Sequence, residues 1–278
     1  MKIAVLSGKG GTGKTFISTN LACIADKATY VDCDVEEPNG HLFLKPEITK
    51  RIPISVLVPH VDESRCTACR KCVDFCKYNV LALAGDKLMI FYEICHSCGG
   101  CTLFCPQKAL TEKEREVGVI EEGVSENVAV LTGLLNTGEV SGVPIIKHLM
   151  EKMPKHETVV IDCPPGSACV VMESIREADF CILVAEPTSF GVHNLTMIYE
   201  LVTLFNIPFG VVINKVLPGE NPAQKFCAEH KINILTQIPF DEELGRLNSK
   251  GHIVVDESKK YRKLFQELLK TVEGEVAK

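Results

Sequence analysis

Short apolar segments alternate with segments of helical periodicity over most of this chain. The apolar segments predict strands at residues 3–6, 53–59, 128–131, 158–162, 180–185 and 208–213. Apolar residues at helical spacing predict helices at residues 16–25, 143–153, 192–205 and 258–272. Strands that are apolar at nearly every position belong to sheets that helices cover on both faces. We therefore predict an α/β fold built on a doubly wound, mostly parallel sheet.

Two runs of cysteines interrupt this pattern between residues 60 and 111. They are Cys66-x2-Cys69-x2-Cys72-x3-Cys76 and Cys95-x2-Cys98-x2-Cys101-x3-Cys105-Pro106. In bacterial ferredoxins with this spacing, the fourth cysteine of each run ligates the other of two [4Fe–4S] clusters. We expect one cluster on Cys66, Cys69, Cys72 and Cys105, and the other on Cys95, Cys98, Cys101 and Cys76.

Zinc is the alternative ligand for these cysteines. A structural zinc site closes a tetrahedron with four ligands, so it has no use for the third and fourth cysteines of each run. The spacing thus favours clusters, although the first run has Lys77 where the second has Pro106, which affects the expected cluster environment and potential. Residues 60–111 are predicted as a small inserted ferredoxin-like α+β domain, and residues 1–59 and 112–278 as one α/β domain.

Residues 8–15 read Gly-Lys-Gly-Gly-Thr-Gly-Lys-Thr and fit the pattern G-x-x-x-x-G-K-[ST] between a predicted strand and a predicted helix. In such a P-loop the backbone N–H groups surround phosphate oxygens at the positive end of the helix. Lys14 would reach the β- and γ-phosphates, and the Thr15 hydroxyl would ligate Mg²⁺. The alternative is a glycine-rich turn of another βα unit, which the strand–loop–helix context disfavours.

The run from Lys9 to Thr15 resembles the deviant P-loop of the MinD/ParA ATPases, a superfamily that includes the nitrogenase iron protein and the Mrp-type iron–sulfur carriers. The resemblance implies that Lys9 crosses a dimer interface to the partner's nucleotide, in an ATP-dependent homodimer or a heterodimer with a paralogue. The alternative is a solvated loop lysine. The resemblance extends over nearly all of the chain outside the cysteine-rich insert, which makes the α/β domain a predicted P-loop ATPase.

Further segments match the family in order along the chain. By this resemblance Asp34 orients the attacking water, Asp32 lies near Mg²⁺ together with Thr15, and Asp162 holds Mg²⁺ through water. The alternative for Asp32 and Asp34 is a pair of solvated acids at a strand end. Lys9, Lys14, Asp34 and Asp162 are the implied catalytic residues. The residues implied to bind ATP are Gly8, Lys9, Gly10, Gly11, Thr12, Gly13, Lys14, Thr15, Phe16, Gly166, Asn214 and Pro239.

Two of these segments bear on specificity. Asn214 would read the adenine edge and the loop at Pro239 would close over the base. No N/T-K-x-D guanine pattern follows the strand, so we expect ATP rather than GTP.

Cys163 and Cys169 flank the turn that the resemblance identifies as switch II. A free cysteine is most often a buried packing residue, and a role in metal or thiol chemistry is the alternative. The chain lacks a late C-x2-C pair like that of the Mrp-type carriers. The amphipathic segment at residues 258–272 is predicted to cover the sheet; the alternative is a membrane-targeting helix like that of MinD proteins.

Composition narrows the function classes. The chain has 278 residues, is 46% hydrophobic and 24% charged, and has a net charge of −6, so we expect no broad electrostatic binding to nucleic acid. No apolar stretch reaches the length of a membrane span, and a strand at the N-terminus leaves no room for a signal peptide. We expect a cytoplasmic protein, where most of the 14 cysteines would bind metal rather than form disulfides.

Three functions follow as hypotheses. The first is an ATPase that couples nucleotide-dependent dimerisation to electron transfer, or to metallocluster assembly, on a partner protein. The second is a ParA/MinD-like positioning switch whose ferredoxin module docks or senses redox state. The third is an iron–sulfur cluster carrier, which the two complete four-cysteine sites disfavour.

Overall fold

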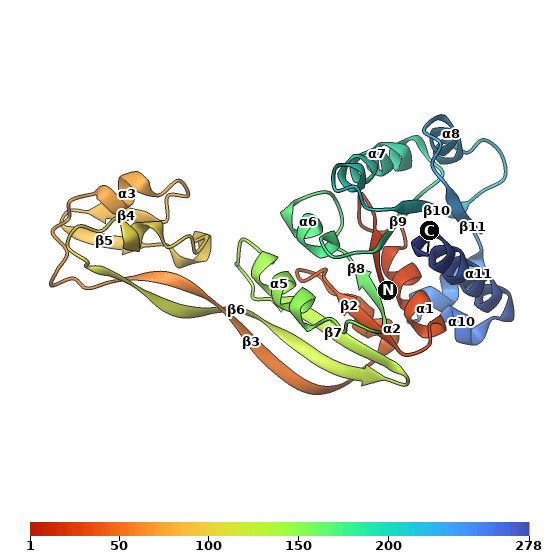
Figure 1. The fold of residues 1–278 in the computed structure, drawn as a ribbon, viewed down its shortest axis with the longest axis horizontal. Helices are drawn as coiled ribbons and strands as arrows, with labels where there is room; N and C mark the ends of the chain where they lie inside the picture. Colours follow the sequence, from red (N-terminus) through yellow and green to blue (C-terminus); the bar gives the residue numbers. More distant parts are fainter. Residues whose placement is uncertain (278) are drawn as a thin grey trace.

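The computed structural model describes residues 1–277, and a nine-stranded sheet forms its framework (Figure 1). In sheet order the strands are β11 (Ile234–Pro239), β10 (Phe209–Val216), β9 (Phe180–Ala185), β1 (Lys2–Leu6), β8 (Thr158–Asp162), β2 (Ala28–Asp32), β7 (Val128–Leu135), β6 (Leu110–Ser125) and β3 (Glu47–Val61). Neighbours from β11 to β7 are parallel, whereas β6 is antiparallel to both β7 and β3. The predicted α/β fold with a mostly parallel sheet is confirmed.

Helices pack on both faces of the sheet. One face carries α1 (Lys14–Ile24), α9 (Glu242–Ser249), α10 (Val254–Glu257) and α11 (Lys259–Val276), and the other α5 (Val143–Lys152), α6 (Cys169–Ile175), α7 (Ser189–Leu204) and α8 (Pro222–Glu229). The helices α1, α9, α10 and α11 enclose a first core against the sheet, and α5, α6, α7 and α8 enclose a second. Within β1, Ile3 and Val5 belong to the first core and Ala4 and Leu6 to the second. A strand buried on both faces needs apolar side chains at every position, which is why these strands are continuous apolar segments.

The C-terminal helix α11 covers the sheet, as predicted. Its apolar side chains Tyr261, Phe265, Leu268, Leu269 and Val272 are buried in the first core. The Phe265 ring meets the Phe16 ring of α1 edge-on, with centroids 5.6 Å apart. Over residues 1–277, no helix is long and apolar enough to cross a membrane.

Strands β3 and β6 form a long two-stranded arm. They pair with each other from Glu47 opposite Val124 to Val61 opposite Leu110, but only residues 118–125 of β6 also pair with β7. The eight residues of β6 before Gly118 therefore extend past the sheet, over roughly 27 Å at about 3.4 Å per residue. In Figure 1 this arm carries the segment between the two strands away from the rest of the molecule.

The strand predicted at residues 53–59 is thus much longer, and most of the arm was missed. Many of its exposed residues are charged, at residues 47–51 of β3 and 111–116 of β6, and cross-strand pairs such as Arg51 with Glu121 stabilise it. These mostly exposed segments have no regular alternation of apolar and polar positions, so the pattern that revealed the core strands could not reveal them.

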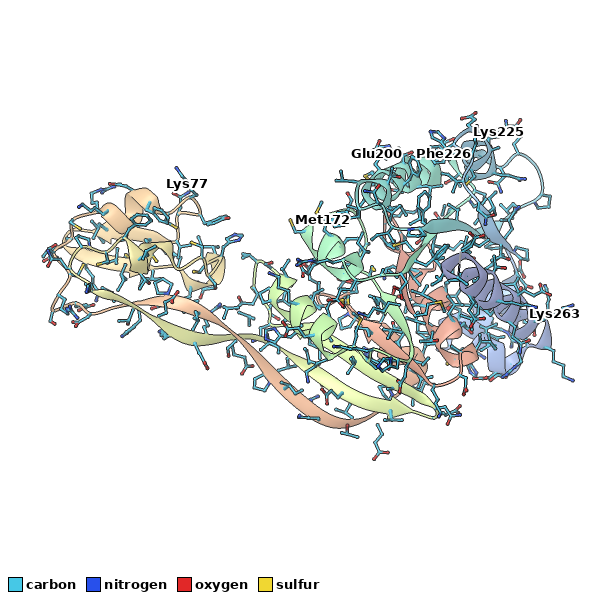
Figure 2. All side chains as sticks on the ribbon, viewed as in Figure 1. Lys77, Met172, Glu200, Lys225, Phe226 and Lys263 are labelled. Carbon is cyan, nitrogen blue, oxygen red and sulfur yellow. The ribbon has the colours of Figure 1, made fainter. Side chains whose placement is uncertain are left out.

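Residues 62–109 form a small lobe at the end of the arm, within the segment predicted as the insert. It contains β4 (Leu81–Ala84), β5 (Lys87–Ile90), α3 (Lys71–Phe75), α4 (Gly100–Leu103) and the 3₁₀ turn η1 (Tyr92–Ile94). Its core is Val80, Leu81 and Leu88, together with Leu110 at the start of β6, with partly buried cysteines packed around them. In Figure 2, Lys77 marks this lobe and Lys263 of α11 marks the opposite end of the molecule. Such a small core leaves the lobe dependent on further stabilisation.

Candidate functional site

The P-loop joins β1 to α1 at the carboxyl edge of the parallel strands. Gly11 and Gly13 have φ angles of 78° and 99°, in the left-handed region that glycine adopts without strain. A Cβ atom on Gly13 would lie 2.2 Å from Nδ2 of Asn214, and one on Gly8 would lie 2.3 Å from the carbonyl oxygen of Asn194. Glycine is therefore required here both by backbone conformation and by the close approach of two neighbouring elements.

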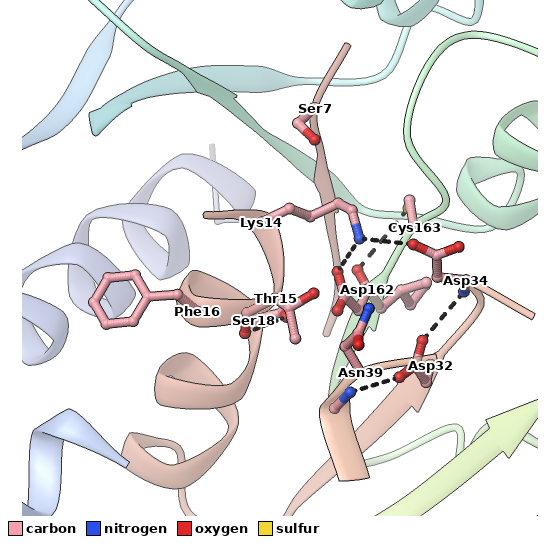
Figure 3. A network of polar contacts seen from close by, with 12 residues as sticks. Ser7, Lys14, Thr15, Phe16, Ser18, Asp32, Asp34, Asn39, Asp162 and Cys163 are labelled. Carbon is pink, nitrogen blue, oxygen red and sulfur yellow. Dashed lines mark hydrogen bonds and ion pairs between the residues drawn. The ribbon is translucent and has the colours of Figure 1, made fainter. Parts of the chain in front are cut away.

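Lys14, the first residue of α1, points into a group of carboxylates (Figure 3). Its Nζ lies 2.8 Å from Oδ1 of Asp162, at the end of β8, and 3.7 Å from Oδ2 of Asp34. Burial by itself favours the neutral amine, but the two carboxylates outweigh it and raise the pKa of Lys14. The structure therefore holds a charged ammonium at the point where the P-loop pattern predicts phosphate binding.

Asp32 and Asp34 occupy different environments at the end of β2. Asp32 is fully buried; its Oδ2 accepts a hydrogen bond from the N–H of Gly40 at 2.9 Å, and its Oδ1 one from the N–H of Asp34 at 3.2 Å. Burial and the nearby Asp162 raise the pKa of Asp32. Asp34 lies past the strand on the wall of a cavity, and burial raises its pKa to about 6 despite Lys14. Asp32 is therefore shielded from solvent, whereas Asp34 stays partly accessible from the cavity.

A cavity of about 750 Å³ opens in front of this group. Of the residues predicted to bind nucleotide or act on it, Gly10, Gly11, Gly13, Lys14, Thr15, Phe16 and Asp34 line this cavity. Apolar wall is added by Leu42 and Phe43, within the short helix α2 (Gly40–Leu44), and by Pro164 and Pro165 after β8. The cavity thus offers backbone N–H groups, one cation and carboxylates at its base, with apolar surface at its sides.

Asn214 and Pro239 are not among the residues that line this cavity. Asn214 is buried at the end of β10 and donates from Nδ2 to the carbonyl oxygen of Thr12 at 2.8 Å. Its side chain therefore supports the P-loop in this structure, and its predicted contact with adenine stays a prediction. Pro239, at the end of β11, is exposed.

Glu186, which the sequence analysis did not select, holds two lysines beside the P-loop. Its carboxylate lies 2.7 Å from Nζ of Lys9 and 2.8 Å from Nζ of Lys215, which in turn donates to the carbonyl oxygen of Gly11 at 2.7 Å. Partial burial would raise the pKa of Glu186, but the two lysines outweigh it and lower that pKa. The position of Glu186 directly after an apolar strand was the available signal, since ligands gather at this edge of the sheet.

Tyr30 is the second residue that the sequence analysis missed. It is fully buried on β2, and its hydroxyl donates to Oδ2 of Asp162 at 2.8 Å. Burial and the Asp162 carboxylate raise the pKa of Tyr30 well above its usual value, so it remains a donor. A tyrosine within an apolar strand carries no pattern that would have marked it as part of a site.

The switch II candidates are separated in space. The N–H of Gly166 donates to the carbonyl oxygen of Ser7 at 2.9 Å, and its φ of 90° again suits glycine. Cys163 is buried in the second core with Cys33 and Cys181, whereas Cys169 is exposed at the start of α6. Packing thus accounts for Cys163, while Cys169 has no contact that assigns it a role.

The eight cysteines of the lobe line two separate cavities. Cys66, Cys69, Cys72 and Cys105 line one of about 20 Å³ together with Leu83 and Leu88. Cys76, Cys95, Cys98 and Cys101 line the other, of about 520 Å³, together with Phe75, Tyr78 and His96. Each set takes three cysteines from one run and the fourth from the other. Within the described residues, no three His, Cys, Asp or Glu side chains converge as the ligands of one metal ion.

Comparison with known proteins places the chain in a family. Residues 3–254 match the CobQ/CobB/MinD/ParA nucleotide binding domain. The uncharacterized protein MJ0578 of Methanocaldococcus jannaschii is 31% identical over 273 residues, which cover 96% of this chain and 95% of that protein. An iron-sulfur cluster carrier protein of the same organism is 23% identical over 299 residues, covering 98% and 85%.

The fold has solved counterparts. The septum site-determining protein MinD of Pyrococcus horikoshii, in complex with Mg-ADP, aligns over 98% of this chain and 95% of its own with a TM-score of 0.61 and 18% identity. This similarity concerns the fold, whereas the domain match covers most of the sequence. The chain belongs to the CobQ/CobB/MinD/ParA family of nucleotide-binding domains.

Proposed function

We propose that this protein is a Mg²⁺-dependent ATPase that carries two [4Fe–4S] clusters and couples nucleotide-dependent dimerisation to electron transfer, or to metallocluster assembly, on a partner protein. The observation that carries the proposal is the union, in one chain, of a P-loop site with a lobe whose eight cysteines form two sets of four. Neither part alone distinguishes this function from the alternatives.

The nucleotide site has the groups that phosphoryl transfer needs. Backbone N–H groups of the P-loop would hold the phosphates, and Lys14 would move from Asp162 and Asp34 to the β- and γ-phosphate oxygens. Thr15, Asp32 and Asp162 would be the oxygen donors near a Mg²⁺ ion, which would neutralise the developing phosphate charge. With Lys14 withdrawn, Asp34 would be left at the cavity wall to accept a hydrogen bond from water.

The reaction is hydrolysis by in-line displacement. Water attacks the γ-phosphorus, the bond from that phosphorus to the β–γ bridging oxygen breaks, and the proton of the water leaves with the products ADP and phosphate. Lys14, and Lys9 of a second copy, would stabilise charge on the phosphoryl oxygens. For this, Lys9 must leave Glu186, its partner within the chain.

The grouping of the eight cysteines supports cubane clusters, because each set takes three cysteines from one run and the fourth from the other. No three acidic, histidine or cysteine side chains of the described lobe converge on one point, so neither set is arranged in advance for a single metal ion. A cubane instead holds its four thiolates apart, one at each iron. The cavity of about 520 Å³ has room for a cluster. The cavity lined by Cys66, Cys69, Cys72 and Cys105 holds little more than one water, so it would have to open to take a cluster. The bound clusters would supply one-electron transfer.

The arm bears on what the clusters serve. It holds the lobe roughly 27 Å beyond the sheet, so the clusters would lie apart from the nucleotide of the same chain and accessible to another protein. Delivery of electrons to a partner therefore fits better than redox chemistry at the P-loop. The name of the 23% identical relative keeps the iron–sulfur carrier as a second candidate.

The test is anaerobic measurement of both cluster potentials by EPR-monitored titration, with and without ATP and Mg²⁺, alongside ATP turnover. We expect ATP hydrolysis, reversible cluster reduction and a shift of tens of millivolts with nucleotide. Unshifted potentials with intact ATP-driven dimerisation would support a positioning switch instead. Transfer of a cluster to an apo-acceptor would support the carrier. A preparation that binds zinc and no iron would contradict the proposal.

A further inference from the structure

The two oxygens of the Asp162 carboxylate are held by donors from two different elements. Lys14, at the start of α1, lies 2.8 Å from Oδ1, and the Tyr30 hydroxyl donates to Oδ2 at 2.8 Å. Asp162 and Tyr30 are both fully buried, on neighbouring parallel strands in which Tyr30 is opposite Val160. Tyr30 therefore reaches forward along the sheet to the acid at the end of the next strand.

The position of the Tyr30 ring depends on the glycine at residue 40. A Cβ atom on Gly40 would lie 2.2 Å from the Tyr30 hydroxyl oxygen and 2.3 Å from its ring. The N–H of the same glycine donates to Oδ2 of Asp32 at 2.9 Å. Gly40 thus allows the turn after β2 to hold Asp32 while the tyrosine passes beneath it to Asp162.

We propose that Tyr30 is a positioning residue for Asp162, which it holds with Oδ1 turned toward the P-loop. The inference rests on the proposed function, because it assumes that Asp162 serves a nucleotide-bound Mg²⁺. When phosphate draws Lys14 away, Oδ1 loses its partner while Tyr30 keeps Oδ2. The carboxylate would then have Oδ1 free to help hold a hydrated Mg²⁺, which would supply charge neutralisation when bound.

Without the tyrosine hydroxyl, the buried carboxylate would lose its fixed donor. It would be free to rotate and to hold the Lys14 ammonium with both oxygens, which opposes the transfer of Lys14 to phosphate. A hydrogen bond to a charged group contributes more than one between neutral groups. The expected effect is therefore on the gain in nucleotide affinity that Mg²⁺ provides, and less on binding without the metal.

The experiment compares Tyr30→Phe with the wild type by calorimetric titration of ADP, in EDTA and in saturating Mg²⁺. We expect the Mg²⁺-dependent gain in affinity to fall about tenfold, with affinity in EDTA changed less than twofold. Gly40→Ala would crowd the Tyr30 hydroxyl but would also disturb the turn that holds Asp32, so we expect the same loss from it, and Tyr30→Phe is the variant that tests the tyrosine by itself.

Tyr261→Phe is the matched control. The Tyr261 hydroxyl also donates to a carboxylate, Oδ2 of Asp241, at 2.6 Å, but it lies on α11 outside the P-loop cavity. We expect it to lower stability and to leave the Mg²⁺-dependent gain at the wild-type value. A Tyr30→Phe protein that loses stability but keeps the full gain would overturn the proposal, because Tyr30 would then be structural only.

The outcomes separate the two proposals. Wild-type ATP hydrolysis with an unchanged Mg²⁺ gain in Tyr30→Phe contradicts the role of Tyr30 alone. If the wild type hydrolyses no ATP, but Tyr30→Phe shows a smaller Mg²⁺-dependent gain in ADP affinity than the wild type, the role of Tyr30 is supported and the ATPase is contradicted. A wild type whose ADP affinity does not respond to Mg²⁺ overturns both.

Discussion

Lys9 and Glu186 form an ion pair within one chain, with Nζ of the lysine 2.7 Å from Oε2 of the carboxylate. Lys9 also lies over the ring of Phe190, 5.1 Å from its centroid. A lysine that serves a second subunit has to give up both contacts when the dimer forms. In the proposed dimer the cost of that release would be part of the free energy of dimerisation, and the ion pair with Glu186 would contribute to it.

We therefore expect Glu186→Gln to strengthen ATP-dependent dimerisation. A half-buried ion pair of this kind contributes up to about 1 kcal/mol, so the dimer dissociation constant should fall about two- to fivefold. Sedimentation equilibrium with a non-hydrolysable ATP analogue measures it. Lys9→Ala is the control and should lose the dimer. If Glu186→Gln weakens the dimer as strongly as Lys9→Ala, then Glu186 acts at the interface itself and the expectation is wrong.

Lys14 should stabilise the protein as well as bind phosphate. Lys14→Met leaves the fully buried Asp162 without its cation, so we expect a loss of about 3 kcal/mol in the free energy of unfolding together with loss of ATP turnover. The double variant Lys14→Met/Asp162→Asn removes the uncompensated charge. It should recover most of the stability and none of the turnover, as measured by urea unfolding and phosphate release. A double variant no more stable than the single one would contradict this account.

The Asp241 carboxylate, which caps α9, makes a pH-dependent contribution to the free energy of unfolding. Asp241 accepts hydrogen bonds from Tyr261 and from the N–H groups of Leu244 and Glu243, and these lower its pKa to about 2. Because the folded-state pKa lies below the usual value of about 3.9, the contribution is complete above pH 4 and is lost as the pH falls toward 2.

Asp241→Asn should accordingly be less stable than the wild type at pH 7. The difference in the free energy of unfolding between the two proteins should narrow steadily between pH 4 and pH 2, because protonation removes the same charge from the wild-type side chain. Urea unfolding of both proteins across this range measures it. A difference that is the same at pH 7 and near pH 2 would show that the cap acts through geometry alone.

Removal of the proposed clusters should unfold the lobe and spare the nucleotide domain. The lobe core has only four buried apolar residues, whereas the sheet is packed by two large cores. After anaerobic iron chelation, limited proteolysis should cut within residues 62–109 while ADP affinity changes less than twofold. Cys101→Ser and Cys105→Ser should each lose one cluster, and from different sets. Equal resistance to protease with and without iron would contradict a folding role for the clusters.

Much of the framework followed from the chain's local patterns. Strands β8 and β9 lie at residues 158–162 and 180–185, as predicted, and α5 and α11 differ from the expected ranges by a few residues. These elements are buried on one or both faces, so burial itself imposes their periodicity. Residues 47–51 and 111–116 of the arm, which include Lys50 and Glu112, are mostly exposed and have no such constraint, so its length could not be anticipated.

The candidate site divides in the same way. The amino-acid sequence was sufficient for the turn of the P-loop at Gly13 and for the grouping of cysteines, because both depend on spacings of a few residues and on the conformations that each residue allows. It could not show that Tyr30, 132 positions from Asp162 along the chain, and Lys14, 148 positions away, hold the two oxygens of that carboxylate. Nor could it show Glu186 between Lys9 and Lys215. Such contacts exist only once the parallel strands are ordered in the sheet, since strand order brings side chains together irrespective of their separation in the sequence.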